Sequence, residues 1–309
     1  MKFRRLGKTG LKVSEVGMGC WAIGGNEHGN SYGPTNDVDS IKAIEKALDL
    51  GCNFFDTADV YGWGHSEELL GKALKHRRDT AIIATKVGGD FTKGIVRKNF
   101  DPKYIRYALD KSLERLQTNY IDIYQLHNPD LQTIREGTAF KVLEDLKIEG
   151  KIKFYGVSIH DPIEGMEAMK FSGISTIQVV YNMLEQNAAK DLFKFTRANG
   201  VGIIAREPLA NGFLTGKYNM NTSFPKGDIR SSFPAEYKQF LISNVEKIKK
   251  ILAHRREPLP QLALKFVLWE DAVSTAIPGI KNDKQALENL TVSRVADLER
   301  EDLVQLKFW

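Results

Sequence analysis

Four polar side chains of types that transfer protons stand at or near the ends of apolar segments. Asp56 and Tyr61 lie in the segment NFFDTADVYG, residues 53–62. Lys86 ends the next apolar run, and His127 ends the one after it. A tyrosine is a weak acid because its unperturbed pKa is about 10, but a nearby ammonium lowers that pKa and a carboxylate can hold the ammonium in place. With a histidine, such a set can hydrogen-bond a carbonyl oxygen and donate a proton to it.

Eight short apolar segments would position these side chains. Most are apolar on both faces, as in Phe54-Phe55 and Ile82-Ile83, which is typical of strands buried in a parallel sheet. Amphipathic stretches with helical spacing lie between them. The predicted strands are Val16–Trp21, Asn53–Thr57, Ala81–Lys86, Ile121–His127, Phe154–Ile159, Thr176–Tyr181, Gly202–Arg206 and Ser274–Pro278.

Local signals mark the ends of the intervening helices. Asp101 and Asp161 each precede a proline, the pattern of an N-cap residue followed by proline at the first helical position. A glycine just before a strand is typical of a left-handed residue that ends a helix. The glycines expected in this role are Gly51, Gly150, Gly173 and Gly200.

Eight repeats of strand and helix predict an α/β fold, a single (β/α)8 TIM barrel that occupies residues 1–309 as one domain. A doubly wound open sheet is the structural alternative. Residues 1–13 have the pattern of a hairpin, expected to cover the N-terminal end of the barrel. Between the seventh and eighth strands lie a long loop, Asn211–Pro234, and an extra helix, Ala235–His254. Long inserted loops are usually functional.

The composition is that of a soluble globular protein. Of 309 residues, 42% are hydrophobic and 27% charged, and the net charge of +5 is too diffuse to indicate a nucleic-acid surface. No apolar run approaches the ~20 residues of a membrane helix, and the basic start does not lead into a signal-peptide stretch. Cys20 and Cys52 lack metal-ligand spacing. We therefore expect a cytoplasmic protein, monomeric by default, with no metal, membrane or nucleic-acid partner.

Barrel enzymes carry their chemistry where the strands end at their C-terminal side, so these ends test the fold prediction. Polar side chains occupy six of them. Burying several ionisable groups separately would be costly, so we expect one shared polar pocket. The residues at or near the ends of strands two to seven are Asp56, Lys86, His127, Ser158, Gln178 and the pair Arg206-Glu207.

The ordered set of motifs resembles the aldo-keto reductases. Residues 53–62, with Thr85-Lys86 and Gln125-Leu126-His127, look like the catalytic tetrad of that family. The similarity covers essentially the whole chain in the family's order. Other family-like stretches are Leu6–Gly19 (LGKTGLKVSEVGMG), Asp122–Pro129 (DIYQLHNP), Gly156-Val157-Ser158, Pro208–Tyr218 (PLANGFLTGKY) and Ile277-Pro278-Gly279.

The resemblance implies an NADP-dependent oxidoreductase that reduces aldehydes or ketones to alcohols and, in reverse, oxidises a CH–OH donor. In the family's roles, Tyr61 would be the general acid and Lys86 would lower its pKa. Asp56 would pair with Lys86, and His127 would orient the carbonyl group.

The resemblance also implies a nicotinamide coenzyme, NADPH in preference to NADH, extended across the C-terminal face of the barrel. Ser158 and Gln178 would hold its carboxamide, and residues 208–217 would cover its pyrophosphate. Lys281 would contact the 2′-phosphate, because Gln285 stands where strongly NADPH-selective members often have arginine. The implied coenzyme-binding residues are Gly19, Trp21, Asp56, Ser158, Gln178, Arg206, Pro208, Leu209, Gly212, Leu214, Gly216, Lys217, Gly279, Lys281, Gln285, Glu288 and Asn289.

Two positions at the nicotinamide end depart from the family pattern. Ile159 stands where many members have an asparagine that contacts the carboxamide. Arg206 stands where many have an aromatic residue that stacks on the nicotinamide. A planar guanidinium can also lie against a ring, so we expect stacking in altered form.

Aromatic residues in the loops after the first three strands would line an apolar substrate pocket. Trp309, at the end of the chain, could cap the barrel. The expected substrate-contacting residues are Trp21, Tyr61, Trp63, Phe91 and His127.

Three other interpretations of the sequence compete with this one. Residues 17–22 match the GxGxxA dinucleotide fingerprint, but the residues that follow cannot begin the required helix, so we treat the match as fortuitous. A non-catalytic or slow NADPH-binding redox sensor or auxiliary subunit on the same barrel stays open until turnover is measured. A (β/α)8 lyase or isomerase without nicotinamide would be separated by a coenzyme titration.

Overall fold

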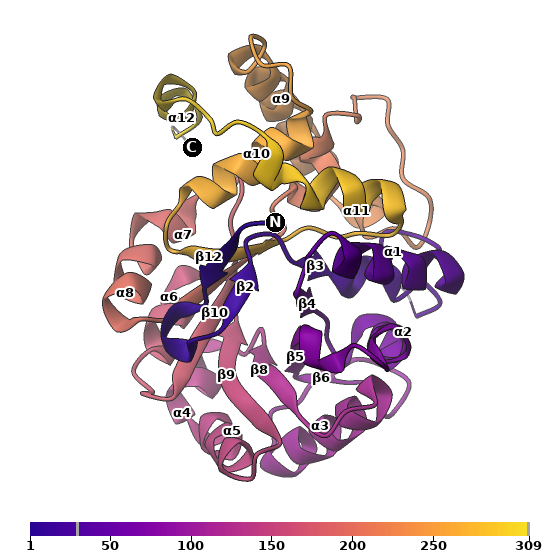
Figure 1. Cartoon of the computed structure of the whole chain (residues 1–309), viewed down its shortest axis with the longest axis vertical. Helices are drawn as coiled ribbons and strands as arrows, with labels where there is room; N and C mark the ends of the chain where they lie inside the picture. The colour runs from indigo at the N-terminus through magenta and orange to yellow at the C-terminus, as the bar shows by residue number, and fades with distance from the viewer. Residues whose placement is uncertain (29–30, 308–309) are drawn as a thin grey trace.

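An eight-stranded parallel sheet forms the centre of the molecule (Figure 1). The computed structural model describes residues 1–28 and 31–307. Parallel bridges from Val16 to Ala276 and from Gly19 to Gly279 join the first strand to the last, so the sheet closes into a barrel. The predicted (β/α)8 fold is confirmed. In sheet order, the strands are β3 (Met18–Gly19), β4 (Phe54–Asp56), β5 (Ile82–Val87), β8 (Ile121–His127), β9 (Ile152–Ser158), β10 (Ile174–Val180), β11 (Gly202–Arg206) and β12 (Val273–Ile277).

Helices surround the sheet (Figure 1). The helix that follows each barrel strand packs on the outside of the barrel, because only one of its faces is apolar. These eight are α1 (Asp37–Asp49), α2 (His65–Leu74), α3 (Pro102–Leu116), α5 (Thr138–Ile148), α6 (Pro162–Ala168), α8 (Leu192–Asn199), α10 (Leu259–Trp269) and α11 (Asp283–Leu290). The others are the short α4 (Leu131–Glu136) and α7 (Asn187–Lys190), the predicted extra helix α9 (Ala235–Ile251) and the C-terminal α12 (Arg300–Leu306). The last two contact each other at one end of the molecule (Figure 1).

Most of the predicted helix boundaries are confirmed, but one of the four glycines predicted to end a helix does not do so. Asp101 and Asp161 cap α3 and α6 by accepting hydrogen bonds from backbone N–H groups. Gly51, Gly150 and Gly200 are left-handed, with φ of 86°, 75° and 63°. The prediction that Gly173 ends a helix in this conformation is wrong: α6 ends at Ala168 and Gly173 is not left-handed. A side chain at residue 173 would instead overlap the Tyr155 hydroxyl, so close packing requires the glycine.

Two local elements differ from the sequence prediction. The first barrel strand is shorter than predicted, because residues Cys20–Ile23 turn into a 3-10 helix, η2, that contains Trp21. A small antiparallel hairpin, β6 (Gly89–Asp90) and β7 (Arg97–Lys98), follows β5 and was not predicted. Both differences lie at the C-terminal side of the barrel, where loops shape the site.

The N-terminal hairpin covers the N-terminal end of the barrel, as predicted. Strands β1 (Phe3–Arg5) and β2 (Lys12–Ser14) pair antiparallel and are joined by a 3-10 turn, Gly7–Thr9. Leu6 and Val13 are fully buried against apolar side chains inside the barrel. The backbone N–H of Lys8 donates to the Gly200 carbonyl at 2.6 Å, which ties the turn to the start of β11.

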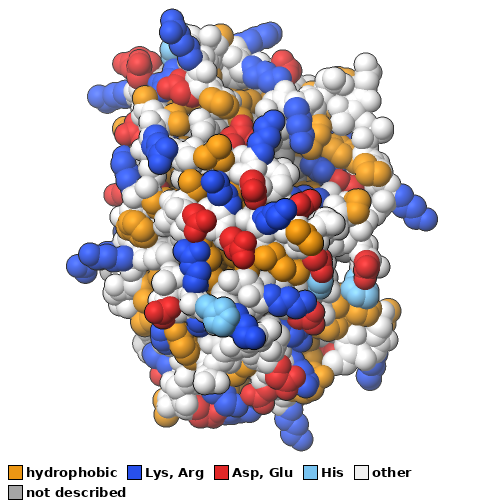
Figure 2. Space-filling view, turned by 45° about the vertical axis from the view of Figure 1, so that its right-hand side comes forward, with side chains coloured by type: hydrophobic (Ala, Val, Ile, Leu, Met, Phe, Trp, Pro, Cys, Tyr) orange, Lys and Arg blue, Asp and Glu red, His pale blue; other side chains and the backbone are white. Residues whose placement is uncertain are grey.

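On the face seen in Figure 2, positively and negatively charged side chains are intermixed. This agrees with the diffuse net charge of the sequence. None of the helices in residues 1–28 and 31–307 is both long and apolar enough to cross a bilayer. Trp309 lies outside the described residues, so its proposed capping role stays a prediction.

The docking of the hairpin can be tested with two glycines that share a left-handed backbone. A side chain at Gly7 would overlap the backbone of Gly202, whereas one at Gly10 would meet no atom within 4 Å. We expect Gly10→Ala to lower the free energy of unfolding by about 1–2 kcal/mol from backbone strain alone. Gly7→Ala should cost about 2–4 kcal/mol, because overpacking adds to the strain. Urea unfolding followed by circular dichroism would measure both, and equal losses would contradict the docking.

Candidate active site

A buried lysine lies at the centre of the predicted polar pocket. Lys86 on β5 and Asp56 at the end of β4 are 0% and 2% exposed. The Lys86 Nζ donates to Asp56 Oδ1 at 2.6 Å, to the Thr57 carbonyl at 2.8 Å and to the Tyr61 hydroxyl at 3.1 Å. Three oxygens therefore fix the ammonium, one of them the phenol oxygen that the sequence predicts to be the proton donor.

Tight loop packing sets the position of Tyr61. Tyr61 begins a 3-10 turn, Tyr61–Gly64 (η3), and the next residue, Gly62, has φ of 59°. A side chain at Gly62 would overlap the carbonyl group of Gly24 in the loop after β3. Glycine follows the tyrosine because it permits both the left-handed backbone and this close approach.

His127 completes the set at the end of β8. Its ring meets the Tyr61 ring edge-on, with 5.7 Å between the ring centroids. Burial, and then the positive charges of Lys86, Lys98 and Arg206, lower the pKa of His127 well below its ordinary value. The imidazole is therefore neutral at pH 7, which suits a hydrogen-bond donor better than an acid.

Burial and charge oppose each other at Tyr61 and Lys86. Burial raises the pKa of Tyr61 above 10, and the Lys86 ammonium acts in the opposite direction. Burial disfavours the ammonium, but Asp56 and Tyr61 together outweigh it and raise the pKa of Lys86. At neutral pH the phenol is protonated and the lysine is charged, so Tyr61 is the group with a proton to donate.

The ends of β8, β9 and β10 place further polar side chains beside this centre. Ser158 on β9 is in register with both His127 on β8 and Gln178 on β10. The Gln178 Nε2 donates to Asp56 Oδ2 at 2.6 Å, so this residue also holds the ion pair. The Ser158 hydroxyl donates to Asn128 Oδ1 at 3.3 Å.

Asn128 is a residue that sequence reasoning missed. It follows His127 directly and has φ of 54°, so its amide can lie beside Ser158. Ile159, the next residue after Ser158, is fully buried in the core. The residue after β8 thus places an amide next to Ser158. The position of Asn128 directly after His127 was the sequence signal that could have identified it.

Aromatic side chains from three loops stand around the polar centre. The Trp21 ring lies 6.4 Å from the Tyr61 ring. The Trp63 and Phe91 rings stack at 5.6 Å, and His28 stacks on Trp63 at 4.1 Å. The unpredicted β6–β7 hairpin carries Phe91 to this place. The loops after β3, β4 and β5 therefore carry the predicted substrate-contacting aromatics in two groups, Trp21 with Tyr61 and Trp63 with Phe91.

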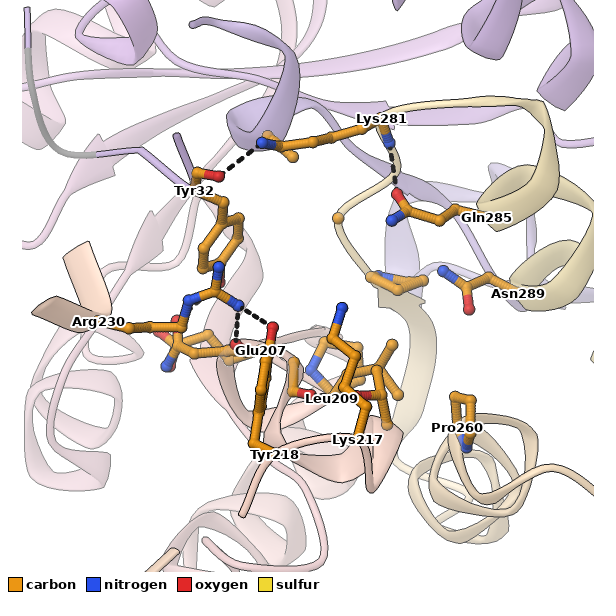
Figure 3. A pocket seen from close by; sticks show the side chains of 17 residues that line it. Tyr32, Glu207, Leu209, Lys217, Tyr218, Arg230, Pro260, Lys281, Gln285 and Asn289 are labelled. Atoms are coloured by element: carbon orange, nitrogen blue, oxygen red, sulfur yellow. Dashed lines mark hydrogen bonds between the residues drawn. The ribbon is translucent and has the colours of Figure 1, made fainter. Parts of the chain in front are cut away.

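A cavity of about 240 Å³ opens at the same C-terminal face of the barrel and is lined by residues that directly follow β11 and β12 (Figure 3). Among the residues predicted to bind coenzyme, those that line it are Pro208, Leu209, Gly212, Lys217, Gly279, Lys281, Gln285 and Asn289. Asn211 and Thr215, which belong to the stretch 208–217 predicted to cover the pyrophosphate, also line it. The wall residues that were not predicted to bind coenzyme are Ala22, Tyr32, Glu207, Tyr218, Arg230, Pro260 and Pro278. The other predicted coenzyme residues are not part of this wall; they are Gly19, Trp21, Asp56, Ser158, Gln178, Arg206, Leu214, Gly216 and Glu288.

Three cationic side chains surround the cavity (Figure 3). The Lys281 Nζ donates to the Tyr32 carbonyl at 2.7 Å, and its backbone N–H donates to Gln285 Oε1 at 2.8 Å. Arg230 comes from the inserted loop and donates to the Tyr218 hydroxyl at 2.6 Å. With Lys217, these side chains place three cations around the cavity, of which Arg230 is paired with Asp228.

The inserted loop folds back onto the loop after the first strand. The Tyr32 hydroxyl donates to Asn211 Oδ1 at 2.7 Å, and Arg230 is held by both oxygens of Asp228 at 2.8 Å and 2.5 Å. The sequence predicts that the inserted loop is functional. No sequence pattern singles out Tyr32 or Arg230, because their positions in the cavity wall depend on the path of that loop.

Comparison with known proteins gives a consistent result. Residues 15–307 match the model of the Aldo/keto reductase family. An aldo-keto reductase of Bacillus subtilis is 34% identical over 94% of this chain and 89% of its own. An aldo-keto reductase of Schizosaccharomyces pombe, whose name specifies NADP(+), is 33% identical over 92% of this chain and 84% of its own. The solved holo structure of an aldo-keto reductase of Bacillus halodurans superposes with a TM-score of 0.84 at 30% identity, covering 99% of this chain and 95% of that one.

Proposed function

The chain belongs to the aldo/keto reductase family, and from this premise we propose that it reduces aldehydes or ketones to alcohols with NADPH as hydride donor and Tyr61 as general acid. Members of the family are oxidoreductases that use nicotinamide coenzymes. The proposal treats residues 1–309 as one domain that acts as a monomer in the cytoplasm on a small carbonyl compound, and it includes the reverse oxidation of a CH–OH donor.

One observation carries the proposal: the Lys86 ammonium is hydrogen-bonded to both the Asp56 carboxylate and the Tyr61 hydroxyl. A fixed cation favours the phenolate that remains after Tyr61 has given up its proton. His127 is neutral at pH 7, which leaves Tyr61 as the acid of the site.

Each residue of the proposed active site has a separate role in the reaction. When bound, the reduced coenzyme supplies a hydride. Tyr61 donates its hydroxyl proton to the carbonyl oxygen, and Lys86 stabilises the resulting phenolate. His127 donates a hydrogen bond that orients the carbonyl group. The loops that carry Trp21, Trp63 and Phe91 would exclude water from the reacting centre.

The residues around the cavity fit the phosphates of such a coenzyme. Lys217, Arg230 and Lys281 supply positive charge around one space, and Gly212 and Gly279 let the backbone approach closely. Ser158 would hold the carboxamide with Gln178, whose amide N–H also braces Asp56. Lys281 would contact the 2′-phosphate that distinguishes NADPH from NADH.

The role of Tyr61 predicts a clear outcome for Tyr61→Phe. The substitution removes the proton donor but little volume. We expect carbonyl reduction to fall about 10²–10⁴-fold, with NADPH binding retained. Steady-state rates with a panel of aldehydes and a coenzyme fluorescence titration would measure the two effects.

A matched control is Tyr124→Phe, which removes a hydroxyl from a fully buried tyrosine of β8 outside the site. Its turnover should stay near that of the wild type. A Tyr61→Phe variant that kept more than about a tenth of wild-type turnover would refute the general-acid role. Wild-type protein that binds NADPH but turns over no carbonyl compound would favour a redox sensor.

The role of Lys281 predicts a change in coenzyme preference. Lys281→Ala should weaken NADPH binding about tenfold or more, because a charge-assisted hydrogen bond to the 2′-phosphate is lost. NADH binding should change little, since NADH lacks that phosphate. Lys284→Ala, at an exposed position of α11, is the control and should alter neither affinity. Equal losses for the two coenzymes in Lys281→Ala would contradict a contact with the 2′-phosphate.

A further inference from the structure

Arg206 is a fixed cation at the catalytic end of the barrel. It ends β11, and its side chain is only 16% exposed. The guanidinium reaches past β10 to the end of β9, where Nη2 donates to the Ile159 carbonyl at 3.1 Å and lies 3.2 Å from His160 Nδ1. Ile159 directly follows Ser158, so this charge is held next to the residue proposed to bind the carboxamide.

Arg206 and its partner Glu207 form an oriented pair. Nη1 of Arg206 is ion-paired with Glu207 Oε1. The other carboxylate oxygen of Glu207 accepts from Asn211 Nδ2 at 2.9 Å, and Glu207 lines the cavity (Figure 3). The carboxylate therefore lies on the side of the cavity, and the guanidinium lies on the side of Ile159 and His160.

The electrostatics of the neighbouring groups agree with this orientation. Burial lowers the pKa of His127, and the charges of Lys86 and Arg206 lower it further. Burial raises the pKa values of Asp56 and Tyr61, and Arg206 opposes this effect. Glu207 instead adds to the burial that raises the pKa of Tyr32 on the cavity side. The guanidinium of Arg206 therefore acts as a positive charge on the catalytic side of the pair.

This charge has a consequence for a nicotinamide ring, because the ring is a cation when oxidised and neutral when reduced. We propose that Arg206 makes the site discriminate between the two oxidation states of the coenzyme, so that NADPH binds more tightly than NADP+. The inference rests on the proposed function. It concerns the affinity ratio of the two forms and not the occurrence of binding or turnover.

The expected size follows from Coulomb's law. At an effective dielectric constant of about 20, two unit charges a few ångströms apart change a binding ratio by roughly 100-fold or more. Glu207 compensates part of the charge of Arg206. We therefore expect Arg206 to contribute about tenfold to the ratio of the dissociation constants for NADP+ and NADPH. For a two-electron couple, tenfold corresponds to about 30 mV in the reduction potential of the bound coenzyme.

Calorimetric titration of NADP+ and NADPH at one pH and salt concentration measures this ratio without turnover. Arg206→Gln should lower the ratio about tenfold by tightening NADP+ binding relative to NADPH binding. Arg206→Lys keeps the charge and should stay near the wild type. Glu207→Gln removes the compensating carboxylate and should raise the ratio.

The opposite signs of these changes separate charge from structure. A structural role for Arg206 would weaken both coenzymes equally and leave the ratio unchanged in Arg206→Gln, which would overturn the proposal. If Arg206→Gln does not fold, an unchanged or lower ratio in Glu207→Gln overturns it instead. Wild-type protein that binds neither coenzyme would refute the proposed function rather than this inference.

Discussion

The ion pair between Lys86 and Asp56 is the interaction on which the site depends. An ammonium with no exposed surface is stable only if it is paired and hydrogen-bonded, and removing one partner of such a pair typically costs about 3–5 kcal/mol. Here the Asp56 carboxylate, the Thr57 carbonyl and the Tyr61 hydroxyl meet that requirement together. The hydroxyl oxygen of Tyr61 is also the atom proposed to donate the proton. The stability of the buried charge and the acidity of the phenol therefore come from a single arrangement.

The barrel makes this arrangement possible by bringing strand ends to one place. Asp56 and Lys86 stand on adjacent strands, and Gln178, from a strand further along the sheet, braces the carboxylate across the barrel. The N-terminal hairpin closes the opposite end, which leaves the polar pocket at one face only. Loops complete the site around this rigid centre: those after β3, β4 and β5 carry the aromatic side chains, and the cationic cavity lies where the loops after β11 and β12 meet.

The sequence predicts the strand ends well because a polar residue at the end of an apolar run has few alternatives in a parallel sheet. Asp56, Lys86 and His127 were found in this way. Tyr32 and Arg230 could not be found, since their places in the cavity depend on how a long loop folds back on the barrel. The first predicted strand, Val16–Trp21, is too long because an apolar segment does not distinguish a strand from a 3-10 turn. Gly173 was misread because a glycine required by packing has the same sequence signal as one required by a helix end.

The central claim is that the Lys86 ammonium lowers the proton affinity of Tyr61 against the effect of burial. It is tested most directly by labelling the tyrosines with ¹³C at Cζ and following Tyr61 by NMR as the pH rises, with the Tyr61→Phe spectrum to assign the resonance. Loss of the ammonium in Lys86→Met disfavours the phenolate, so the Tyr61 pKa should be higher in the variant than in the wild type. A titration midpoint that is unchanged or lower in Lys86→Met would contradict the account.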